Sequence, residues 1–234
     1  SLEYLKFDTP DAIFENKDAR FFASIIYPNA IWKGTEITIQ GGIIRPDGSV
    51  LNTQGSVEHN GTTYYAYGAQ TSNQYSGFEG TPNMTRSGFL MRKFLNENAR
   101  INTWLQSTTD FMDIRYAEIL LNYAEAVVES SAGGAQAAAA KALNDVRRRA
   151  GHTMDIPLTL ENVLRERSVE LAFENKDYWD LVRRRTYHQI FNNFVKTALV
   201  PMLDLRGEEP AYIFVRKDVP GANPNTFPER DYYW

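Results

Sequence analysis

The clearest pattern in this chain is a helical repeat of apolar positions in its middle third. Apolar residues return every three or four positions between residues 114 and 128, as on the buried face of an α-helix. A break rich in Ser, Ala and Gly follows at residues 130–134, and a second apolar stripe then ends at Gly151 after three Arg residues. Gly and basic residues are typical of a helix C-terminus. The spacing therefore predicts an antiparallel hairpin of two helices.

Two more helices are predicted after this hairpin. Thr159 is expected to cap the first of them, because a Thr hydroxyl accepts hydrogen bonds from the free N–H groups of a helix start. We expect that helix to run to about residue 175, and the next one to occupy residues 178–194. From Pro201 the chain carries repeated Pro residues, which predict an irregular tail.

The first 113 residues lack helical periodicity and are rich in turn signals. Asp47-Gly48 and Asn60-Gly61 each separate short segments, and such pairs favour the two-residue turns of β-hairpins. Residues 68–88 are almost entirely Ser, Asn, Thr, Gly, Gln and aromatic, which is typical of a long loop. Loops of that length in compact domains are usually functional or disordered.

These elements predict a mainly α fold of tetratricopeptide-like helical hairpins, of the α-α superhelix type, with an irregular subregion rich in loops and hairpins. The spacing of Ala139, Leu143 and Val146 loosely matches the second helix of a tetratricopeptide repeat. We expect residues 1–113 to hold the loops and hairpins. Residues 114–234 are expected to hold the helical scaffold and the irregular tail, all within one domain.

Charge and composition exclude several classes of protein. The chain has 25 basic and 29 acidic side chains, so its net charge of -4 gives no basic patch for nucleic acid. It has no Cys, which excludes disulfides and thiol nucleophiles. No stretch approaches about 18 apolar residues, so no membrane-spanning helix is expected. A lipid anchor needs an N-terminal Cys and would have to lie outside these residues.

The acidic residues of the helical part do not predict catalysis. A glycosidase needs two carboxyl groups facing each other across a sugar, whereas Glu166 and Glu170 lie four residues apart on one helix and point the same way. Arg167 lies three residues before Glu170, and Asp180 can reach Arg183 or Arg184, so these carboxylates are predicted to be ion-pair partners. The three His residues lack metal-ligand spacing, and only a calcium ion held by loop oxygens stays open.

An aromatic segment is the stronger candidate for a ligand site. Sugars present apolar C–H faces rimmed by hydroxyls, so they favour exposed aromatic rings flanked by amide and Arg groups. Residues 64–86 offer that composition, and a Trp near the first turns adds to it. Strand alternation is expected to bury one of Tyr64 and Tyr65 and to expose the other. The candidate ligand-binding residues are Trp32, Tyr64, Tyr65, Tyr67, Asn73, Tyr75, Phe78 and Arg86.

Five sequence blocks, in the same order along the chain, resemble the SusD/RagB family. The two longest are IRYAEILLNYAEA at residues 114–126 and ERSVELAFE at residues 166–174. The others lie at residues 16–28, 85–94 and 143–151, and the last block continues to residue 184. The chain departs from the family in lacking its N-terminal half, in having Arg185 where an aromatic residue is frequent, and in stopping at Trp234.

The resemblance implies a non-catalytic protein that binds oligosaccharides at the bacterial outer-membrane surface, with no cofactor. It further implies a lipid-anchored parent that delivers its ligand to a TonB-dependent, SusC-like transporter. Two alternatives stay open from the residues alone. One is a helical-hairpin scaffold that binds a protein partner and no glycan. The other is a glycosidase, which is disfavoured because opposed carboxylates are missing.

Overall fold

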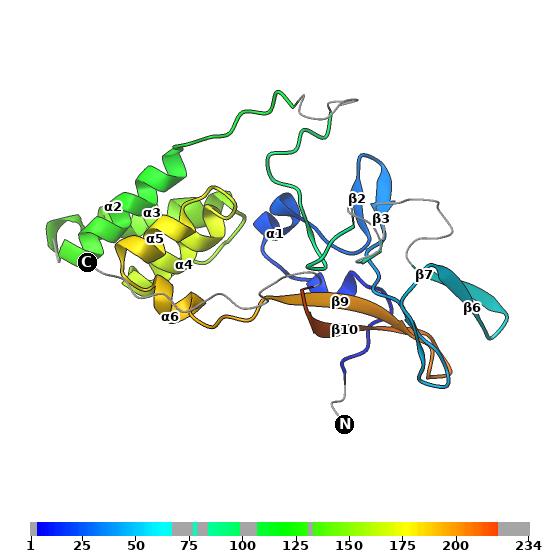
Figure 1. Cartoon of the computed structure of the whole chain (residues 1–234). Helices are drawn as coiled ribbons and strands as arrows, with labels where there is room; N and C mark the ends of the chain where they lie inside the picture. The colour runs from blue at the N-terminus through cyan, green and yellow to red at the C-terminus, as the bar shows by residue number, and fades with distance from the viewer. Residues whose placement is uncertain (1–3, 67–76, 79–83, 99–106, 131–132, 220–234) are drawn as a thin grey trace. The chain divides into compact units, whose positions relative to one another are not determined.

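A computed structural model describes residues 4–66, 77–78, 84–98, 107–130 and 133–219 (Figure 1). These residues divide into two compact units. A strand-rich unit draws on the ranges 1–17, 25–92 and 191–230, and a helical unit on the ranges 18–24 and 93–190. No helix in the described part of the chain combines the length and apolar character needed to cross a bilayer.

The helical unit is built around the predicted hairpin. Helix α2 (Tyr116–Ser130) packs against α3 (Gln136–Arg149), and both pack on α4 (Leu160–Glu170). Their shared core contains apolar side chains from all three helices, including the fully buried Leu121, Leu143 and Val163. The hairpin prediction is therefore confirmed. The described residues of this unit also form α1 (Ala19–Ser24), the 3₁₀ turn η3 (Gly133–Ala135), α5 (Asp177–Arg183) and nearly all of α6 (Tyr187–Phe191), whereas the 3₁₀ turn η1 (Ala12–Phe14) belongs to the strand-rich unit.

The start of α4 was predicted correctly, whereas the ends of the last helices were not. The Thr159 hydroxyl accepts a hydrogen bond from the Asn162 N–H at 3.2 Å, which confirms the predicted cap of α4. The predicted end of that helix near residue 175 is wrong, because α4 stops at Glu170 and Phe173 has a positive φ of 65°. A single helix over residues 178–194 is also wrong. Arg185, with a φ of 56°, separates α5 from α6.

The strand-rich unit contains a four-stranded sheet in the order β10-β9-β4-β5, in which β4 runs parallel to β9 and the other neighbours are antiparallel. Two-stranded pairs join β1 to β8, β2 to β3 and β6 to β7. The strands are β1 (Ile25–Ile26), β2 (Ala30–Trp32), β3 (Thr35–Ile37), β4 (Ile43–Ile44), β5 (Val50–Leu51), β6 (Gly55–His59), β7 (Thr62–Ala66), β8 (Leu90–Met91), β9 (Thr197–Asp204) and β10 (Ala211–Asp218).

The predicted two-residue turn is confirmed at Asn60-Gly61, whereas Asp47-Gly48 lies in a longer hairpin connection, residues 45–49. Asn60 and Gly61 have φ angles of 50° and 78°, the pair of positive values that a two-residue turn between β6 and β7 requires. Gly48, with a φ of 85°, turns the chain between β4 and β5. These turns form where expected because Asn and Gly reach positive φ at low cost.

The predicted mainly α fold is wrong, and the chain is mixed α and β. Of the described residues, 34% are helical and 23% are in strands. The largest difference is the β9–β10 hairpin, which replaces the irregular structure expected from Pro201 onward, as far as residue 218. Pro201 fits because Leu199, Leu203 and Leu205 donate away from β10, so its missing N–H falls on that same side. The single-domain organisation stays a prediction.

Candidate functional site

Trp32 lies at the end of β2, beside the tight turn that leads into β3. Its side chain is half-buried. Two cations lie over its ring. Lys33 Nζ is 5.9 Å from the ring centroid, and Arg92 Cζ is 5.7 Å from it. These distances lie within the range in which an aromatic face attracts a cation.

The strand β7 separates its two candidate tyrosines as alternation requires. Tyr64 is half-buried and packs against the core cluster that contains Ile43, Leu203 and Leu205. Tyr65 points to the other face of the strand and is 39% exposed. The predicted division into one inward and one outward ring is confirmed. An outward ring is what a stacking platform for a sugar needs.

Phe78 does not offer an exposed face. It is only 3% exposed and packs in a core cluster with Val200, Met202 and Ile213. The assignment of Phe78 as a binding residue is therefore corrected, because its ring is part of the core of the sheet. The polar residues around it in the sequence gave no sign of this burial. Arg86 is exposed. Tyr67, Asn73 and Tyr75 lie outside the described residues, and Trp32 and Tyr65 stand on different hairpins.

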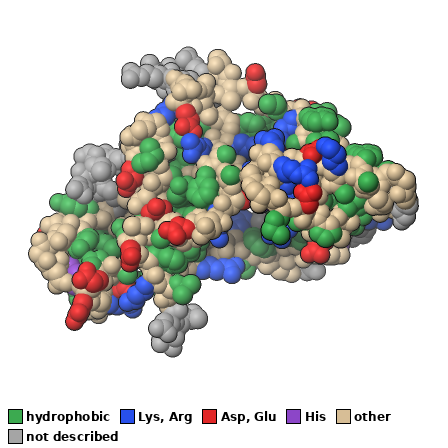
Figure 2. All heavy atoms as spheres, turned by 180° about the vertical axis from the view of Figure 1, so that it is seen from behind, with side chains coloured by type: hydrophobic (Ala, Val, Ile, Leu, Met, Phe, Trp, Pro, Cys, Tyr) green, Lys and Arg blue, Asp and Glu red, His purple; other side chains and the backbone are tan. Residues whose placement is uncertain are grey.

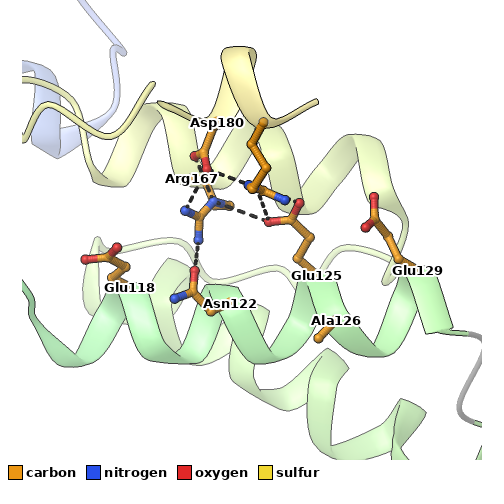
Figure 3. Close-up of a pocket in the computed structure, with 8 residues that line it drawn as sticks. Glu118, Asn122, Glu125, Ala126, Glu129, Arg167 and Asp180 are labelled. Atoms are coloured by element: carbon orange, nitrogen blue, oxygen red, sulfur yellow. Dashed lines mark hydrogen bonds and ion pairs between the residues drawn. The ribbon is translucent and has the colours of Figure 1, made fainter. Parts of the chain in front are cut away.

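The helical unit carries a polar pocket of about 450 Å³ between α2 and α5 (Figure 3). Arg167, from α4, lies across it. Its guanidinium donates to both carboxylate oxygens of Asp180, at 3.0 and 3.1 Å, and to the side-chain oxygen of Asn122. Glu125 is buried and takes hydrogen bonds from Arg183 and Arg184. The carboxylates that line this pocket are thus largely committed to Arg partners.

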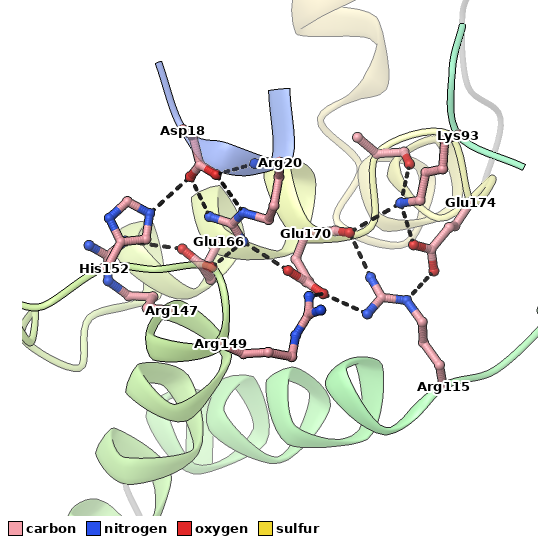
Figure 4. Close-up of polar contacts among 11 residues, drawn as sticks. Asp18, Arg20, Lys93, Arg115, Arg147, Arg149, His152, Glu166, Glu170 and Glu174 are labelled. Atoms are coloured by element: carbon pink, nitrogen blue, oxygen red, sulfur yellow. Dashed lines mark hydrogen bonds and ion pairs between the residues drawn. The ribbon is translucent and has the colours of Figure 1, made fainter. Parts of the chain in front are cut away.

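A second group of charges surrounds Glu166 and Glu170 of α4 (Figure 4). The side chain of Glu170 is 1% exposed and accepts hydrogen bonds from Arg20 at 2.9 Å, from Arg115 at 2.5 Å and from Arg149. Glu174 accepts from Lys93 at 2.6 Å and from Arg115 at 2.7 Å. We call these side chains, together with Asp18, Arg147, His152 and Glu166, the ion network.

The remaining members bind the first residues of α1 to α3 and α4. Glu166 accepts from Arg20 at 2.6 Å and from Arg147 at 3.2 Å. Asp18 takes two side-chain hydrogen bonds from Arg20, at 3.0 and 2.7 Å, and its second oxygen lies 2.9 Å from His152 Nε2. The Arg20 guanidinium holds the pKa of the Asp18 carboxyl well below its usual range, against the opposing effect of burial.

The opposing influences are also visible at Glu174. Burial disfavours the charged form of this carboxylate, but the hydrogen bonds from Arg115 and Lys93 outweigh burial and lower its pKa below the ordinary value. A buried carboxylate with this many cationic partners is ionised and structurally fixed. On the face shown in Figure 2, acidic and basic side chains of the helical unit lie intermixed beside apolar ones.

Comparisons with known proteins agree with this picture. The model of the SusD family matches residues 2–234, almost the whole chain. The chain belongs to the SusD family. A SusD-like protein P2 of Formosa agariphila is 34% identical over 102 residues, which cover 38% of this chain and 20% of that protein. A SusD-like protein of Bacteroides ovatus is 28% identical over 118 residues, covering 50% of this chain and 19% of the relative.

Solved structures show the same relationship for the fold of this SusD-family chain. A crystal structure titled a SusD-like carbohydrate binding protein, from Bacteroides fragilis, superimposes with a TM-score of 0.53 at 25% identity. The match covers 97% of this chain and 44% of that one. The chain spans about a fifth of the length of the curated relatives and less than half of this solved structure.

In this SusD-family chain the predicted ion pairing of Glu166, Glu170 and Asp180 is confirmed, with partners that differ from those suggested by spacing. Asp180 does pair with Arg183, at 3.0 Å. Arg167, however, binds Asp180 and not Glu170 three residues away. Arg20 is a further partner that no local spacing indicates, because it lies 146 residues before Glu166. Among the described residues, no group of His, Asp and Glu is arranged to hold a metal ion.

Proposed function

We propose that this SusD-family chain is part of a non-catalytic protein that binds oligosaccharides. The proposal rests chiefly on family membership, together with the fold shared with a solved relative that is titled a carbohydrate binding protein. Trp32 and Tyr65 add aromatic surface on two hairpins, and Arg86 adds an exposed hydrogen-bond donor. Tyr67, Asn73 and Tyr75 complete the proposed site from the segment between β7 and Phe78. We assign Tyr64 a supporting part in the site, because its ring packs against the core beneath the strand that carries Tyr65.

The state of the acidic residues supports binding without catalysis. A general acid or nucleophile must reach the substrate with a carboxyl group that is free to exchange a proton or attack a sugar carbon. Glu166 and Glu170 are buried under Arg20, Arg147 and Arg115. Glu125 and Asp180 are similarly held by Arg side chains. These carboxylates hold helices together in the geometry described above.

The proposed setting follows from the family resemblance. We place the parent protein at the outer-membrane surface, with a lipid anchor outside these 234 residues, where it delivers glycan to a TonB-dependent transporter of the SusC kind. No cofactor is part of this proposal. The helical unit serves as scaffold, and the hairpins of the strand-rich unit carry the aromatic side chains.

One observation favours a second function, a helical surface that binds a protein. Tyr116, Ile119 and Tyr123 are exposed on α2 at spacings of three and four, and they form a second apolar stripe on a helix whose opposite face is already buried. Exposed apolar stripes of this kind are used to bind partner helices. The stripe would act beside glycan binding or in place of it.

A glycan panel tests the proposal. Calorimetric titration of the 234-residue chain with soluble oligosaccharides is expected to show saturable binding. A reducing-sugar assay of the same mixtures is expected to show no release of new reducing ends. Trp32→Ala and Tyr65→Ala should each weaken binding, whereas Tyr4→Ala serves as the matched control, because Tyr4 is similarly exposed in the same unit. Product release would point to an enzyme. Failure to bind any glycan would favour the helical surface as the functional feature.

A further inference from the structure

The hairpin β2–β3 presents Trp32 and a cation together. Lys33 and Gly34 form its turn with φ angles of 50° and 77°, so Lys33 stands at the tip directly after Trp32. Trp32 is paired with Thr35 across the hairpin, and the neighbouring pair joins Ile31 to Glu36. Since side chains alternate along a strand, the acidic Glu36 points to the face opposite Trp32. The Trp32 ring, with Lys33 over it, therefore lies on the face opposite Glu36.

A second cation reaches the same ring from another strand pair. Arg92 directly follows β8, and its guanidinium carbon lies 5.7 Å from the centroid of the Trp32 ring. Lys33 Nζ lies 5.9 Å from the same centroid. This concentration of positive charge stands out in a chain whose net charge is -4. An aromatic ring attracts a cation to its face and thereby limits the orientations of that cation.

A guanidinium held over an aromatic ring suits the recognition of anions. It has five N–H donors in a planar fork, so it can keep a protein partner and still bind a carboxylate or sulfate group. Hydrogen bonds between charged partners are roughly twice as strong as those between neutral ones. A neutral sugar placed at this ring would gain only the weaker kind.

We propose that the Trp32 site binds acidic saccharides, meaning sugars that carry a carboxylate or a sulfate ester. Trp32 orients Arg92 and Lys33, and these two cations contact the anionic group. The inference rests on the proposed glycan-binding function and adds the ligand class to it. Uronates and sulfated sugars share the chemistry that the site recognises, and the experiment separates them.

The test compares oligosaccharides of equal length that are neutral, uronate-containing or sulfated, at low and high salt. The acidic ligands should bind about tenfold more tightly than the neutral one, since a charge-assisted hydrogen bond is worth about that factor. This preference should shrink when salt is raised from about 20 mM to about 500 mM. The better of the two acidic arms identifies the anionic group.

Variants test whether the preference depends on Lys33 and Arg92 specifically or on the positive charge of the unit in general. Lys33→Gln and Arg92→Gln should each remove most of the preference, lowering the affinity for the acidic ligands more than that for the neutral sugar. Lys17→Gln is the control, because Lys17 is an exposed cation of the same unit and is not one of the two over the ring. Trp32→Leu should reduce the preference as Arg92→Gln does. Thermal melting of each variant confirms that it is folded.

The outcomes distinguish this inference from the function on which it rests. Equal binding of neutral and acidic sugars, with Trp32→Leu weakening both, would overturn the ligand class and leave glycan binding intact. A preference that survives both Lys33→Gln and Arg92→Gln would also overturn it. Absence of binding to all three ligands would reject the proposed function and the inference together.

Discussion

The side chain of Arg115 binds both the side chain and the backbone of Glu170. The guanidinium donates to the carboxylate at 2.5 Å and to the backbone carbonyl oxygen of the same residue at 2.6 Å. Arg115 immediately precedes α2, and Glu170 is the last residue of α4. The carbonyl groups at a helix end lack partners within the helix. The Arg115 side chain thus gives one carbonyl at the end of α4 a partner and connects that end to the start of α2.

Glu170→Gln should be strongly destabilising. Glu170 is the shared partner of Arg20, Arg115 and Arg149, so neutralising it leaves three cations around a site with no charge. Removing one member of a buried pair costs about 3–5 kcal/mol. Glu161→Gln, at an exposed position of the same helix, should cost about 1 kcal/mol or less. Urea unfolding measures both, and equal losses would contradict the central role of Glu170.

Arg167→Lys tests whether the fork of the guanidinium matters beyond its charge. Lys keeps the charge but cannot hold both oxygens of Asp180 together with Asn122. We expect a loss of about 2 kcal/mol or more in the free energy of unfolding. Arg165→Lys, at an exposed position two residues earlier, should change it by about 0.5 kcal/mol at most.

Hydrogen exchange gives a second measure of the same change. Because Asp180 lies within α5, loss of the Arg167 fork should speed amide exchange in α5 more than in α3. An equal increase of the exchange rate in α5 and α3 would argue against a specific link between Arg167 and α5.

The ion network predicts a loss of stability in acid. The pKa of the Asp18 carboxyl is lowered by its hydrogen bonds with Arg20, and that of Glu174 is lowered by Arg115 and Lys93 against burial. A carboxyl whose pKa is lower when folded binds more protons when unfolded. Its contribution is complete above the ordinary values of 3.8 and 4.5, and it declines as the pH falls below them.

The pH dependence of the melting temperature between about pH 6 and about pH 3 checks this expectation. Asp18→Asn should be less stable at neutral pH and should lose less further stability on acidification. Asp8→Asn, at an exposed position, is the control. A profile for Asp18→Asn that runs parallel to the parent profile would exclude Asp18 as a source of the acid sensitivity.

Features set by neighbouring residues could be predicted from the sequence, and long-range features could not. The turn at Asn60-Gly61 and the Thr159 cap depend on bonds within a few residues, so their chemistry is visible locally. The sequence did not predict β9, because Pro lacks an N–H and usually interrupts a strand. In the structure the position of this missing N–H faces away from β10, so the β9–β10 pairing loses no hydrogen bond.

The candidate site shows the same division. Alternation along β7 correctly separated Tyr64 from Tyr65, because strand geometry has a period of two. The burial of Phe78 depends on Val200 and Ile213, more than 120 residues later in the chain, and its polar neighbours suggested the opposite. The Arg92 guanidinium over Trp32 likewise joins strands that no local pattern relates.

Phe78 and Tyr65 make a direct comparison between packing and binding. Phe78→Ala should cost about 3–5 kcal/mol, because it removes a fully buried ring from the sheet core. Tyr65→Ala should change stability by about 1 kcal/mol or less, since its ring is 39% exposed. Glycan affinity should show the reverse order, with the larger loss at Tyr65. A large stability loss in Tyr65→Ala would identify that ring as structural.

Gly88→Ala should destabilise the strand-rich unit through the backbone alone. Gly88 has a φ of 92°, and a Cβ there would collide with the carbonyl oxygen of Leu199 in β9, whose N–H bonds to Ser87. Positive φ and the collision together should cost more than about 1 kcal/mol. Gly134→Ala is the control, because space around that Gly is open and its φ is not positive, so the change should be neutral or stabilising by up to about 1 kcal/mol. Thermal melting compares the two, and equal melting temperatures would show that β9 does not pack against Gly88 in solution.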